Sequence, residues 1–415
     1  MRDETKCLHA GYTPKNGEPR VVPIVQSTTY VYDSTDEVAS VFDEPTKSLI
    51  YSRFANPTVM AVEEKIAALE GGVGAMCTSS GQAASLLSIL NLCNAGDSFL
   101  AAAEIYGGTV NLFTHTLKKL GIECIYIEKG MTDEEIDALF KPNTKAVFGE
   151  TIANPALTVL DIERYANIAH RHGVPLIVDN TFATPVLCKP FDFGADIVIH
   201  STTKYMDGHA VQGGGIIVDS GKFDWTNGNF PDFTEPDVTY HGISYTETYG
   251  KAAYIIKARM QLMRDFGAYP AAHSAFLLNL GLETLALRME RYCENALKVA
   301  KYFEQSDKIE SVTYPGLESD ENHALAEKYL KGSSGVISIV IKGGRDNAVK
   351  FMDSLKLASN EVHVADIRTC VLHPASETHR QLSDEQLVLA GIEPGMVRFS
   401  VGLENVDDII EDIEQ

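Results

Sequence analysis

The feature that most constrains the fold is a series of short apolar runs that alternate with helix-like stretches. Such runs stand at residues 75–78, 98–101, 124–127, 145–148, 175–178 and 196–199. Strands buried on both faces are continuously apolar in this way, and helix-length gaps between them are typical of crossover connections. We therefore expect an α/β fold built on a mostly parallel, doubly wound sheet.

The chain is predicted to divide into three segments. Residues 1–55 are rich in Pro, Thr and Tyr, show no long helical period and are expected to form an extended arm. Asn56 and Pro57 suit the N-cap and first position of a helix that Gly71 would end, so a first domain is expected over residues 56–248. Helix-like stretches at residues 250–263 and 272–301, followed by strand patterns, indicate a smaller α+β domain over residues 249–415.

Charge and composition argue against several classes of partner. The 415-residue chain has 57 acidic and 35 basic side chains, a net charge of −22. Such a surface repels phosphate backbones and anionic lipids, so neither nucleic acid nor a membrane is an expected partner. The sequence begins with no signal-peptide pattern and has no apolar run of about 18 residues. Its seven cysteines are scattered, so no disulfide framework or metal site is indicated and a cytoplasmic location is expected.

Polar residues follow several of the predicted strands, where a doubly wound sheet binds its ligands. The turn at residues 79–84 (SSGQAA) leads into a helix whose free amide groups suit a phosphate, although small-residue turns of this kind are common. Asp179 ends one strand, where it either pairs with a cation or caps a turn. Asn154 follows another strand. Lys204 comes just after a third, behind the hydroxyl side chains of Ser201 and Thr203.

A lysine, an anion site of Ser, Thr and Gly, and an aspartate at neighbouring strand ends describe a pyridoxal phosphate pocket. The lysine amine would form a Schiff base with the aldehyde of the cofactor. The carboxylate would keep the pyridine nitrogen protonated, so that the ring can accept electrons. Tyr106 in the stretch EIYGGT is placed to stack on that ring. The alternative for Lys204 is an ordinary solvated surface charge.

The stretches YSRFANPT, SSGQAA, YGGT, VDNTFATP and HSTTKYMDGH closely resemble the Cys/Met-metabolism family of pyridoxal phosphate enzymes, in family order and over nearly the whole chain. The resemblance implies a fold-type I enzyme in which Lys204 carries the cofactor and moves protons. It implies a homo-oligomer, expected to be a tetramer built as a dimer of dimers, in which the arm reaches the phosphate of a neighbouring subunit. The implied catalytic residues are Lys204 and Tyr106. The implied cofactor-binding residues are Tyr51, Arg53, Ser80, Gly81, Gln82, Tyr106, Asn154, Asp179, Ser201, Thr203 and Lys204, and the implied substrate-binding residues are Arg398, Tyr51 and His363.

The segment at residues 221–250 and the stretch HPASETHRQL are similar to the O-acetylhomoserine sulfhydrylase branch of that family. This implies replacement of acetate in O-acetyl-L-homoserine by sulfide or a small thiol. The alternatives are a methionine or homocysteine gamma-lyase, and a cofactor-binding scaffold without turnover. Gly108 stands where gamma-lyases typically have a cysteine, and we expect the aromatic residues of the 221–250 segment either to cover the entrance to the site or to pack on a neighbouring subunit.

One stretch departs from the family pattern. His363 occupies a place beside the substrate where asparagine or serine would be expected. The motifs leave open the acyl group on homoserine, the choice between sulfide and methanethiol, and the choice between dimer and tetramer.

Overall fold

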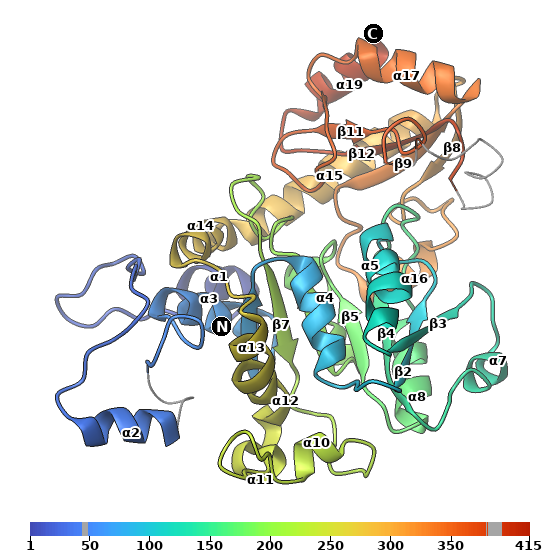
Figure 1. Ribbon diagram of the computed structural model, residues 1–415. Coiled ribbons are helices and arrows are strands. Elements are labelled where there is room, and N and C mark those ends of the chain that lie inside the picture. The colour runs from blue at the N-terminus through green and yellow to red at the C-terminus, as the bar shows by residue number, and fades with distance from the viewer. Residues whose placement is uncertain (44–48, 379, 381–391) are drawn as a thin grey trace.

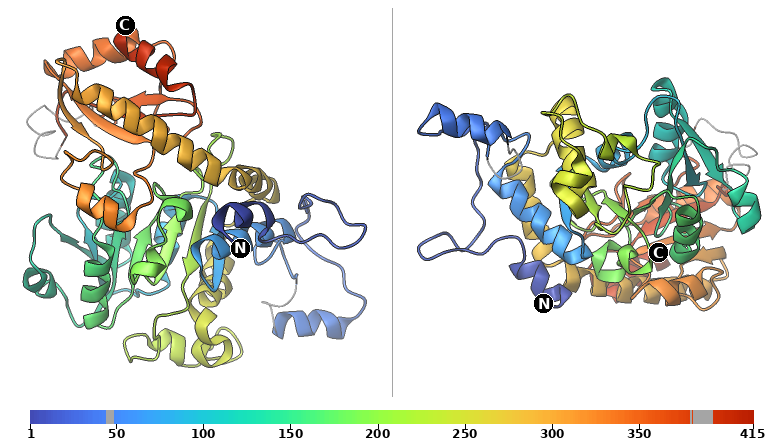
Figure 2. Two further views of the ribbon diagram at one scale, coloured as in Figure 1. Left: turned by 180° about the vertical axis from the view of Figure 1, so that it is seen from behind. Right: turned by 90° about the horizontal axis from the view of Figure 1, so that it is seen from below.

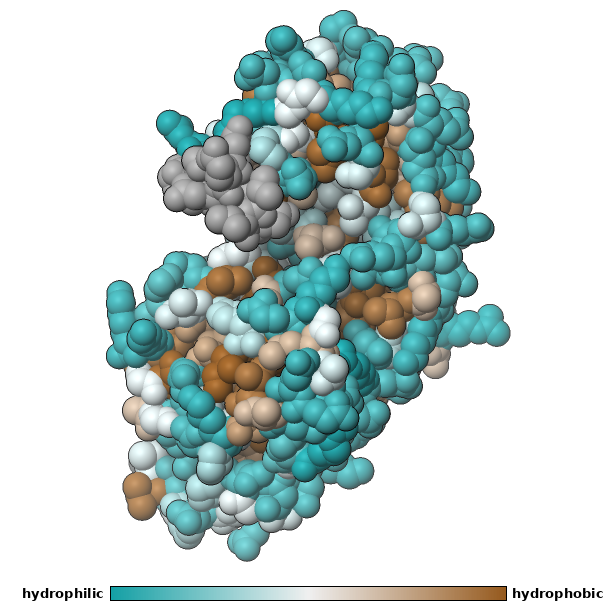
Figure 3. Space-filling view, turned by 90° about the vertical axis from the view of Figure 1, so that its right-hand side faces the viewer, coloured by the Kyte–Doolittle hydropathy of each residue, from teal (hydrophilic) through white to brown (hydrophobic). Residues whose placement is uncertain are grey.

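Two β-sheets organise the computed structural model, which describes residues 1–43, 49–378, 380 and 392–415. The larger part holds a seven-stranded sheet, and the smaller, C-terminal part holds a five-stranded sheet (Figure 1). The two further views show helices on both sides of the larger sheet (Figure 2). The surface is mostly hydrophilic with apolar patches and is indented where the two parts meet (Figure 3).

The larger sheet is mostly parallel, as predicted. Its strand order is β1-β7-β6-β5-β4-β2-β3, and only β7 runs antiparallel to its neighbours. The strands are β1 (Gly74–Thr78), β2 (Ser98–Ala102), β3 (Glu123–Ile127), β4 (Thr144–Glu150), β5 (Leu176–Asp179), β6 (Ile197–His200) and β7 (Gly215–Asp219). Because the other strands all point the same way, their carboxyl ends lie along one edge of the sheet.

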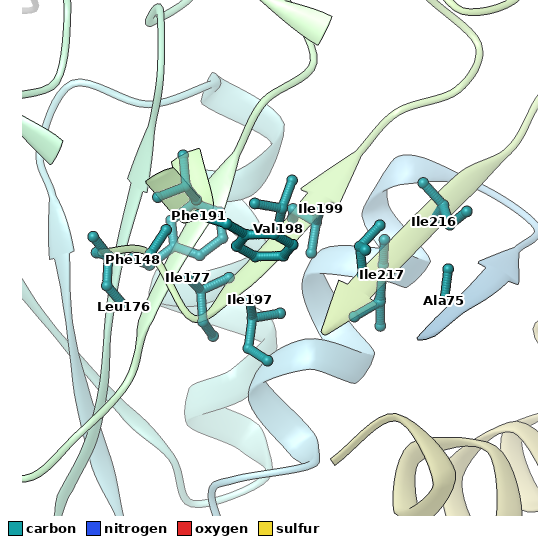
Figure 4. Close-up of a cluster of buried hydrophobic side chains, with 14 of the residues drawn as sticks. Ala75, Phe148, Leu176, Ile177, Phe191, Ile197, Val198, Ile199, Ile216 and Ile217 are labelled. Atoms are coloured by element: carbon teal, nitrogen blue, oxygen red, sulfur yellow. The ribbon is translucent and has the colours of Figure 1, made fainter. Parts of the chain in front are cut away.

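Apolar side chains on both faces of these strands form the main core. Ile197, Val198 and Ile199 are fully buried, and Figure 4 shows them packed among side chains from β4, β5 and β7. Three helices supply much of the cover: α3 (Pro57–Glu70) packs on β1 and β7, α4 (Gly81–Leu90) on β6 and β7, and α8 (Ile162–Arg171) on β4 and β5. The continuously apolar runs of the sequence are explained by this two-sided burial.

The start of α3 confirms the prediction made from Asn56 and Pro57. The Asn56 side chain accepts a hydrogen bond from the Thr58 amide, and Pro57 occupies the first turn. Gly71 ends the helix with a φ of 84°, a left-handed conformation that residues with a Cβ adopt at a cost.

The N-terminal segment is less extended than predicted, because it contains α1 (Asp3–His9) and α2 (Thr35–Asp43). Helix α1 packs against α3, α14 and α15 of its own chain. Cys7 is buried there, and its carbonyl accepts a hydrogen bond of 2.8 Å from Lys65 Nζ. Seven residues are too few to give a clear helical period in a sequence, so tertiary contacts decide the structure of α1.

The smaller part contains a sheet of order β10-β11-β12-β9-β8, in which β10 and β11 are parallel and the other pairs antiparallel. Val397, Phe399 and Val401 face its core, while Arg398 lies on the opposite face, as their alternation predicts. Its elements are α14 (Ala272–Glu283), α15 (Leu285–Glu304), β8 (Ile309–Thr313), α16 (His323–Tyr329), β9 (Val336–Ile341), α17 (Gly344–Ser354), β10 (Ser359–Asn360), β11 (Cys370–Leu372), β12 (Met396–Ser400) and α19 (Val406–Glu414). The stretch predicted as one helix from 272 to 301 is broken at Thr284.

Shorter helices connect these elements. They are α5 (Gly107–Asn111), the π-helix η1 (Leu112–Thr116), α6 (Leu117–Lys119), α7 (Asp133–Asp137), α9 (Thr184–Leu187), η2 (Pro190–Phe193), α10 (Pro231–Thr234), α11 (Tyr245–Tyr249), η3 (Gly250–Ala252), α12 (Ala253–Lys257), the π-helix η4 (Ala258–Met263) and α13 (Arg264–Phe266). None of the helices in the described part of the chain is both long and apolar enough to cross a membrane.

Three aromatic side chains of the 221–250 segment, Trp225, Phe230 and Phe233, are buried in the core. They do not line the cavity at the carboxyl edge of the larger sheet, so of the two alternatives the one in which they cover the entrance to the site is wrong. Trp225 stacks on Phe233 at 4.6 Å and on Tyr254 of α12 at 5.3 Å between ring centroids. Figure 1 shows α10 and α11 at the bottom of the molecule, away from the carboxyl edge of the sheet. Aromatic content predicts that these side chains are buried, but it does not predict against which part of the molecule they pack.

Candidate active site

A cavity of about 560 Å³ opens at the carboxyl edge of the larger sheet, against the smaller part. Its wall brings together nearly all the residues predicted at strand ends. Those from the larger part are Ser80, Gly81, Gln82, Tyr106, Asn154, Asp179, Ser201, Thr203 and Lys204. Arg398, on β12, lines the cavity from the smaller part, together with Val362, Val364 and Leu372. The site is therefore built between the two sheets.

Lys204 follows β6 and lines the cavity. The pKa of the amine is lowered to about 8, because burial disfavours the charged form and the neighbouring Arg398 guanidinium adds to the effect. A lysine with such a pKa is partly neutral near physiological pH, as an amine must be to attack an aldehyde.

This pKa predicts how cofactor capture depends on pH. For the full chain freed of cofactor, the rate of pyridoxal phosphate uptake should rise about tenfold per pH unit and level off near pH 8. The absorbance of the lysine-bound cofactor measures this rate. A rate that keeps rising to pH ~10, where an ordinary lysine titrates, would show that burial does not lower the pKa of Lys204.

Asp179 ends β5 and lines the cavity, where it is partly buried. Its pKa is raised because burial disfavours the charge, while hydrogen bonds from the Thr181 amide and hydroxyl and the nearby His200 act in the opposite direction. Among the described residues no cation forms an ion pair with it. A partly buried carboxylate without a cation partner fits the protonated ring nitrogen of pyridoxal phosphate, which would supply the missing positive charge.

The first turn of α4 lies against the loop after β6. A Cβ added at Gly81 would lie 2.6 Å from the Cβ of Ser201, so only glycine lets the two segments approach. Ser80 caps the helix by accepting a hydrogen bond from the Ala83 amide at 3.1 Å, and it lines the cavity beside the helix N-terminus. Thr203 is fixed by hydrogen bonds between its Oγ1 and the backbone of Gly214. Free amides at a helix N-terminus beside hydroxyl groups fit a phosphate.

Tyr106 is 48% exposed and lies in the wall of the cavity, where its ring is free to stack on a planar ligand. Its amide donates a 2.7 Å hydrogen bond to Glu150 Oε1, which fixes the start of α5. Gly108 lies against the ring, because an added Cβ would be 2.5 Å from a Tyr106 ring carbon and 2.7 Å from Gln82 Nε2. Any side chain at position 108 therefore displaces the tyrosine or the glutamine.

We predict that Gly108→Ala weakens cofactor binding about tenfold, since aromatic stacking contributes about 0.5–1.5 kcal/mol and depends on the ring position. Gly107→Ala is the matched control, because a Cβ at Gly107 meets no atom within 4 Å. Equilibrium titration with pyridoxal phosphate compares the two variants. Equal affinity of both for the cofactor would rule out a role for Gly108 in placing the ring.

Arg398 is a buried cation, 6% exposed, that reaches the cavity from β12. It donates hydrogen bonds to Asn154 Oδ1 at 3.0 Å and to the His363 carbonyl at 3.2 Å. Burial lowers its pKa, and among the described residues it forms no ion pair with a carboxylate. A guanidinium held in this way fits the carboxylate of an amino-acid substrate.

Tyr51 and Arg53 do not line the cavity of their own chain. The Arg53 guanidinium lies 5.3 Å from the centroid of the Tyr51 ring, and its Nε is buried without a hydrogen-bond partner in the described part of the chain. The stretch HPASETHRQL, which resembles a family motif, lies partly outside the described residues, since 379, 381 and 382 are not described.

Sequence reasoning missed three polar groups of the site. Glu150 holds Tyr106, and its pKa is raised well above its ordinary range by burial and by the Asp179 charge. Thr181 links β5 to the loop after β6, because its Oγ1 also accepts a hydrogen bond from the Ser201 amide. His200 Nε2 lies 2.6 Å from Glu70 Oε1, and both side chains are fully buried behind Asp179. The one sequence signal for Glu150, Thr181 and His200 is that each lies at or near the end of a strand.

Two histidines at the end of α8, His170 and His172, each have a carboxylate partner. His170 Nε2 lies 2.8 Å from Asp196 Oδ2, and His172 Nε2 lies 2.8 Å from Asp137 Oδ1. Within the described ranges, no three His, Cys, Asp or Glu side chains gather in a way that could hold a metal ion.

Comparison with known proteins agrees with this geometry. The family model described as Cys/Met metabolism PLP-dependent enzyme matches residues 4–415. The chain is 44% identical to an O-acetyl-L-homoserine sulfhydrylase of Leptospira meyeri, covering 100% of this chain and 96% of the relative. It is 46% identical to a homocysteine synthase of Schizosaccharomyces pombe, covering 99% and 97% of the two chains.

A solved structure, named as an O-acetylhomoserine (thiol)-lyase from Campylobacter jejuni, superposes with a TM-score of 0.95 at 36% identity, covering 100% of this chain and 99% of the other. That structure carries pyridoxyl-lysine-5'-monophosphate, in which the cofactor is bonded to a lysine. With the fold, the cavity and a family model that spans almost every residue in agreement, the chain belongs to the family of Cys/Met-metabolism pyridoxal phosphate-dependent enzymes.

Proposed function

We propose that this protein is an O-acetylhomoserine sulfhydrylase, which replaces the acetate of O-acetyl-L-homoserine by sulfide to give L-homocysteine. Relatives that match the whole chain at 44–46% identity have this activity in their names. The observation in the structure that carries the proposal is that Lys204 and Arg398, from the two parts of the molecule, line the same cavity. This arrangement places an amine with a lowered pKa beside a buried guanidinium suited to an amino-acid carboxylate.

Each group has a role in the proposed reaction. Pyridoxal phosphate, when bound, would supply an electron sink for removal of the proton on Cα of the substrate. Arg398 binds the substrate carboxylate, which orients Cα toward Lys204. Lys204 removes that proton and holds it at Nζ for return to the product. Asp179 would keep a positive charge on the cofactor ring, and the α4 N-terminus with Ser201 and Thr203 would hold the phosphate.

A gamma-lyase is the second candidate. It would use the same cavity, but water rather than sulfide would complete the reaction. Gly108 favours replacement, because the glycine leaves no thiol beside Tyr106 to assist elimination. Product analysis tests the choice. O-acetylhomoserine should yield homocysteine with sulfide present, and 2-oxobutyrate with ammonia as the main products would overturn the proposal.

The arm is proposed to complete the site of a neighbouring subunit, in a tetramer built as a dimer of dimers. Support comes from the position of Tyr51 and Arg53 outside the cavity of their own chain. The buried and unpartnered Nε of Arg53 suits a phosphate oxygen, which a second chain would bring. A cytoplasmic location is part of the proposal, supported by seven cysteines that are all free.

A mixing experiment tests the shared site. Arg53→Ala and Lys204→Ala proteins should each be impaired, and a hybrid dimer should regain one intact site from the two. Random exchange of equal amounts should restore about a quarter of the wild-type activity, because half the dimers are hybrid and each has one good site. No recovery, after subunit exchange has been demonstrated by a tag, would contradict the proposal that Arg53 acts across the interface.

A further inference from the structure

The imidazole of His363 lies against the amine of Lys204. The distance from His363 Nδ1 to Lys204 Nζ is 3.4 Å, at the long end of hydrogen bonding, across 159 positions of sequence. Hydrogen bonds in sites without ligand are often long and shorten when the ligand binds. His363 lies between β10 and β11 of the smaller part, and Lys204 follows β6 of the larger part. The contact therefore joins the two parts at the reacting atom.

The backbone around His363 is fixed on several sides. Its carbonyl accepts hydrogen bonds from Arg398 Nη2 at 3.2 Å and from Cys370 Sγ at 3.5 Å. Ala365, two residues on, donates its amide to Ser400 Oγ of β12 at 2.7 Å. The ring Nε2 is buried and has no hydrogen-bond partner among the described residues. These contacts hold the His363 side chain so that its Nδ1 atom faces the Lys204 amine.

Charges around the pair decide which atom donates. The pKa of His363 is lowered below its ordinary value of 6.5 by burial and by the positive charge of Lys204, with Asp366, Glu361 and Asp207 acting in the opposite direction. The pKa of Lys204, lowered by burial and Arg398, remains higher, at about 8. A shared proton therefore stays on Lys204, which donates to Nδ1, while the neutral ring carries its own hydrogen at Nε2.

Building on the proposed function, we infer that His363 is a positioning residue for the catalytic lysine. Its Nδ1 accepts a hydrogen bond from the Lys204 amine whenever the incoming amino acid has released that amine from the cofactor. No bond to carbon changes between the two residues: Lys204 Nζ takes the Cα proton, becomes an ammonium group, and returns one of its three hydrogens to the substrate. The lysine side chain has four rotatable bonds, so a fixed acceptor keeps the amine near the substrate between proton transfers.

The test uses L-2-aminobutyrate, which has the carbon frame of homoserine and no leaving group. Exchange of its Cα proton in D2O, followed by NMR, reports proton transfer by Lys204 without sulfide or acetate. His363→Phe should lower the maximal exchange rate about 10²-fold, the cost of a small misplacement of a catalytic group. The half-saturating concentration of the amino acid should change little, because Arg398 is retained.

His363→Asn is the rescue variant, because asparagine Oδ1 and histidine Nδ1 are both bonded to Cγ and so occupy similar positions. It should restore most of the exchange rate. It should also lose the extra decline at acid pH that protonation of His363 causes in the wild type, since an amide does not titrate. His363→Gln, which moves the acceptor one bond further out, should restore less.

A binding measurement without turnover provides a second readout. The absorbance change when L-2-aminobutyrate displaces Lys204 from the cofactor gives an equilibrium constant over a range of pH. Displacement should weaken at acid pH in the wild type and much less in His363→Asn, because only the imidazole loses its acceptor by protonation.

Two results would overturn the inference. One is wild-type exchange in His363→Phe, and the other is equal slowing of the Phe and Asn variants, which would make His363 part of the scaffold only. The proposed function fails separately. If the wild type exchanges the Cα proton but makes no homocysteine from O-acetylhomoserine and sulfide, the assigned reaction is wrong and the role of His363 stands.

Discussion

Lys204→Ala should abolish covalent attachment of the cofactor and lower kcat by about 10⁴-fold, the upper range for loss of a general base. Lys204 is the one lysine among the described residues that line the cavity, and alanine offers no amine to replace it. Borohydride reduction followed by mass spectrometry should find the cofactor on the peptide with Lys204 in the wild type and on no peptide in the variant.

Lys257→Met is the matched control for this prediction. The pKa of Lys257 is also lowered to about 8 by burial, but its amine lies against Asn91 and the Phe233 ring, outside the cavity. The control should keep the reducible bond to the cofactor. A Lys204→Ala protein that retains this bond, or that turns over at the wild-type rate, would show that another lysine carries the cofactor.

Asp179→Asn should produce the second-largest loss, about 10²- to 10³-fold in kcat, comparable to removing one preorganised electrostatic group from an active site. Asparagine fills the same space but has no charge to hold a proton on the ring nitrogen. The cofactor should still bond to Lys204, so the lysine-bound absorbance should remain while kcat falls.

Thr181→Val distinguishes the effect of the Asp179 charge from the effect of the hydrogen bond that holds the Asp179 carboxylate. It removes the hydroxyl that bonds to Asp179 Oδ1 and leaves the carboxylate in place, so we expect a smaller loss than in Asp179→Asn. Steady-state kinetics with saturating cofactor compares the two. If Asp179→Asn stays within a few-fold of the wild type, the carboxylate does not act on the ring.

The strands and the residues at their ends could be predicted from the sequence because both depend on local patterns. Runs such as 196–199 are apolar since both faces of β6 are buried, and the polar residues that follow must lie at the carboxyl edge. The conformation of Asn56 and Gly71 at the ends of α3 follows from capping rules that need only a few neighbouring residues.

The remaining features depend on contacts that local patterns do not encode. The approach of His363 to Lys204 and of Arg398 to Asn154 depends on how the two parts pack, across 159 and 244 positions of sequence. Composition alone leaves open whether Trp225 and its aromatic neighbours cover the entrance or pack on a neighbouring subunit, whereas the structure buries them against α12. The sequence does not indicate a role for Glu150, because a glutamate at the end of an apolar strand is usually exposed to solvent.

The proposed reaction is tested most directly by a ratio of two rates measured on one preparation. One is homocysteine formation from O-acetylhomoserine and sulfide, and the other is 2-oxobutyrate formation from methionine alone. We expect the first rate to exceed the second, because a site without a thiol beside Tyr106 should favour capture of the reacting chain by sulfide. Faster breakdown of methionine would contradict the assignment and identify the protein as a gamma-lyase.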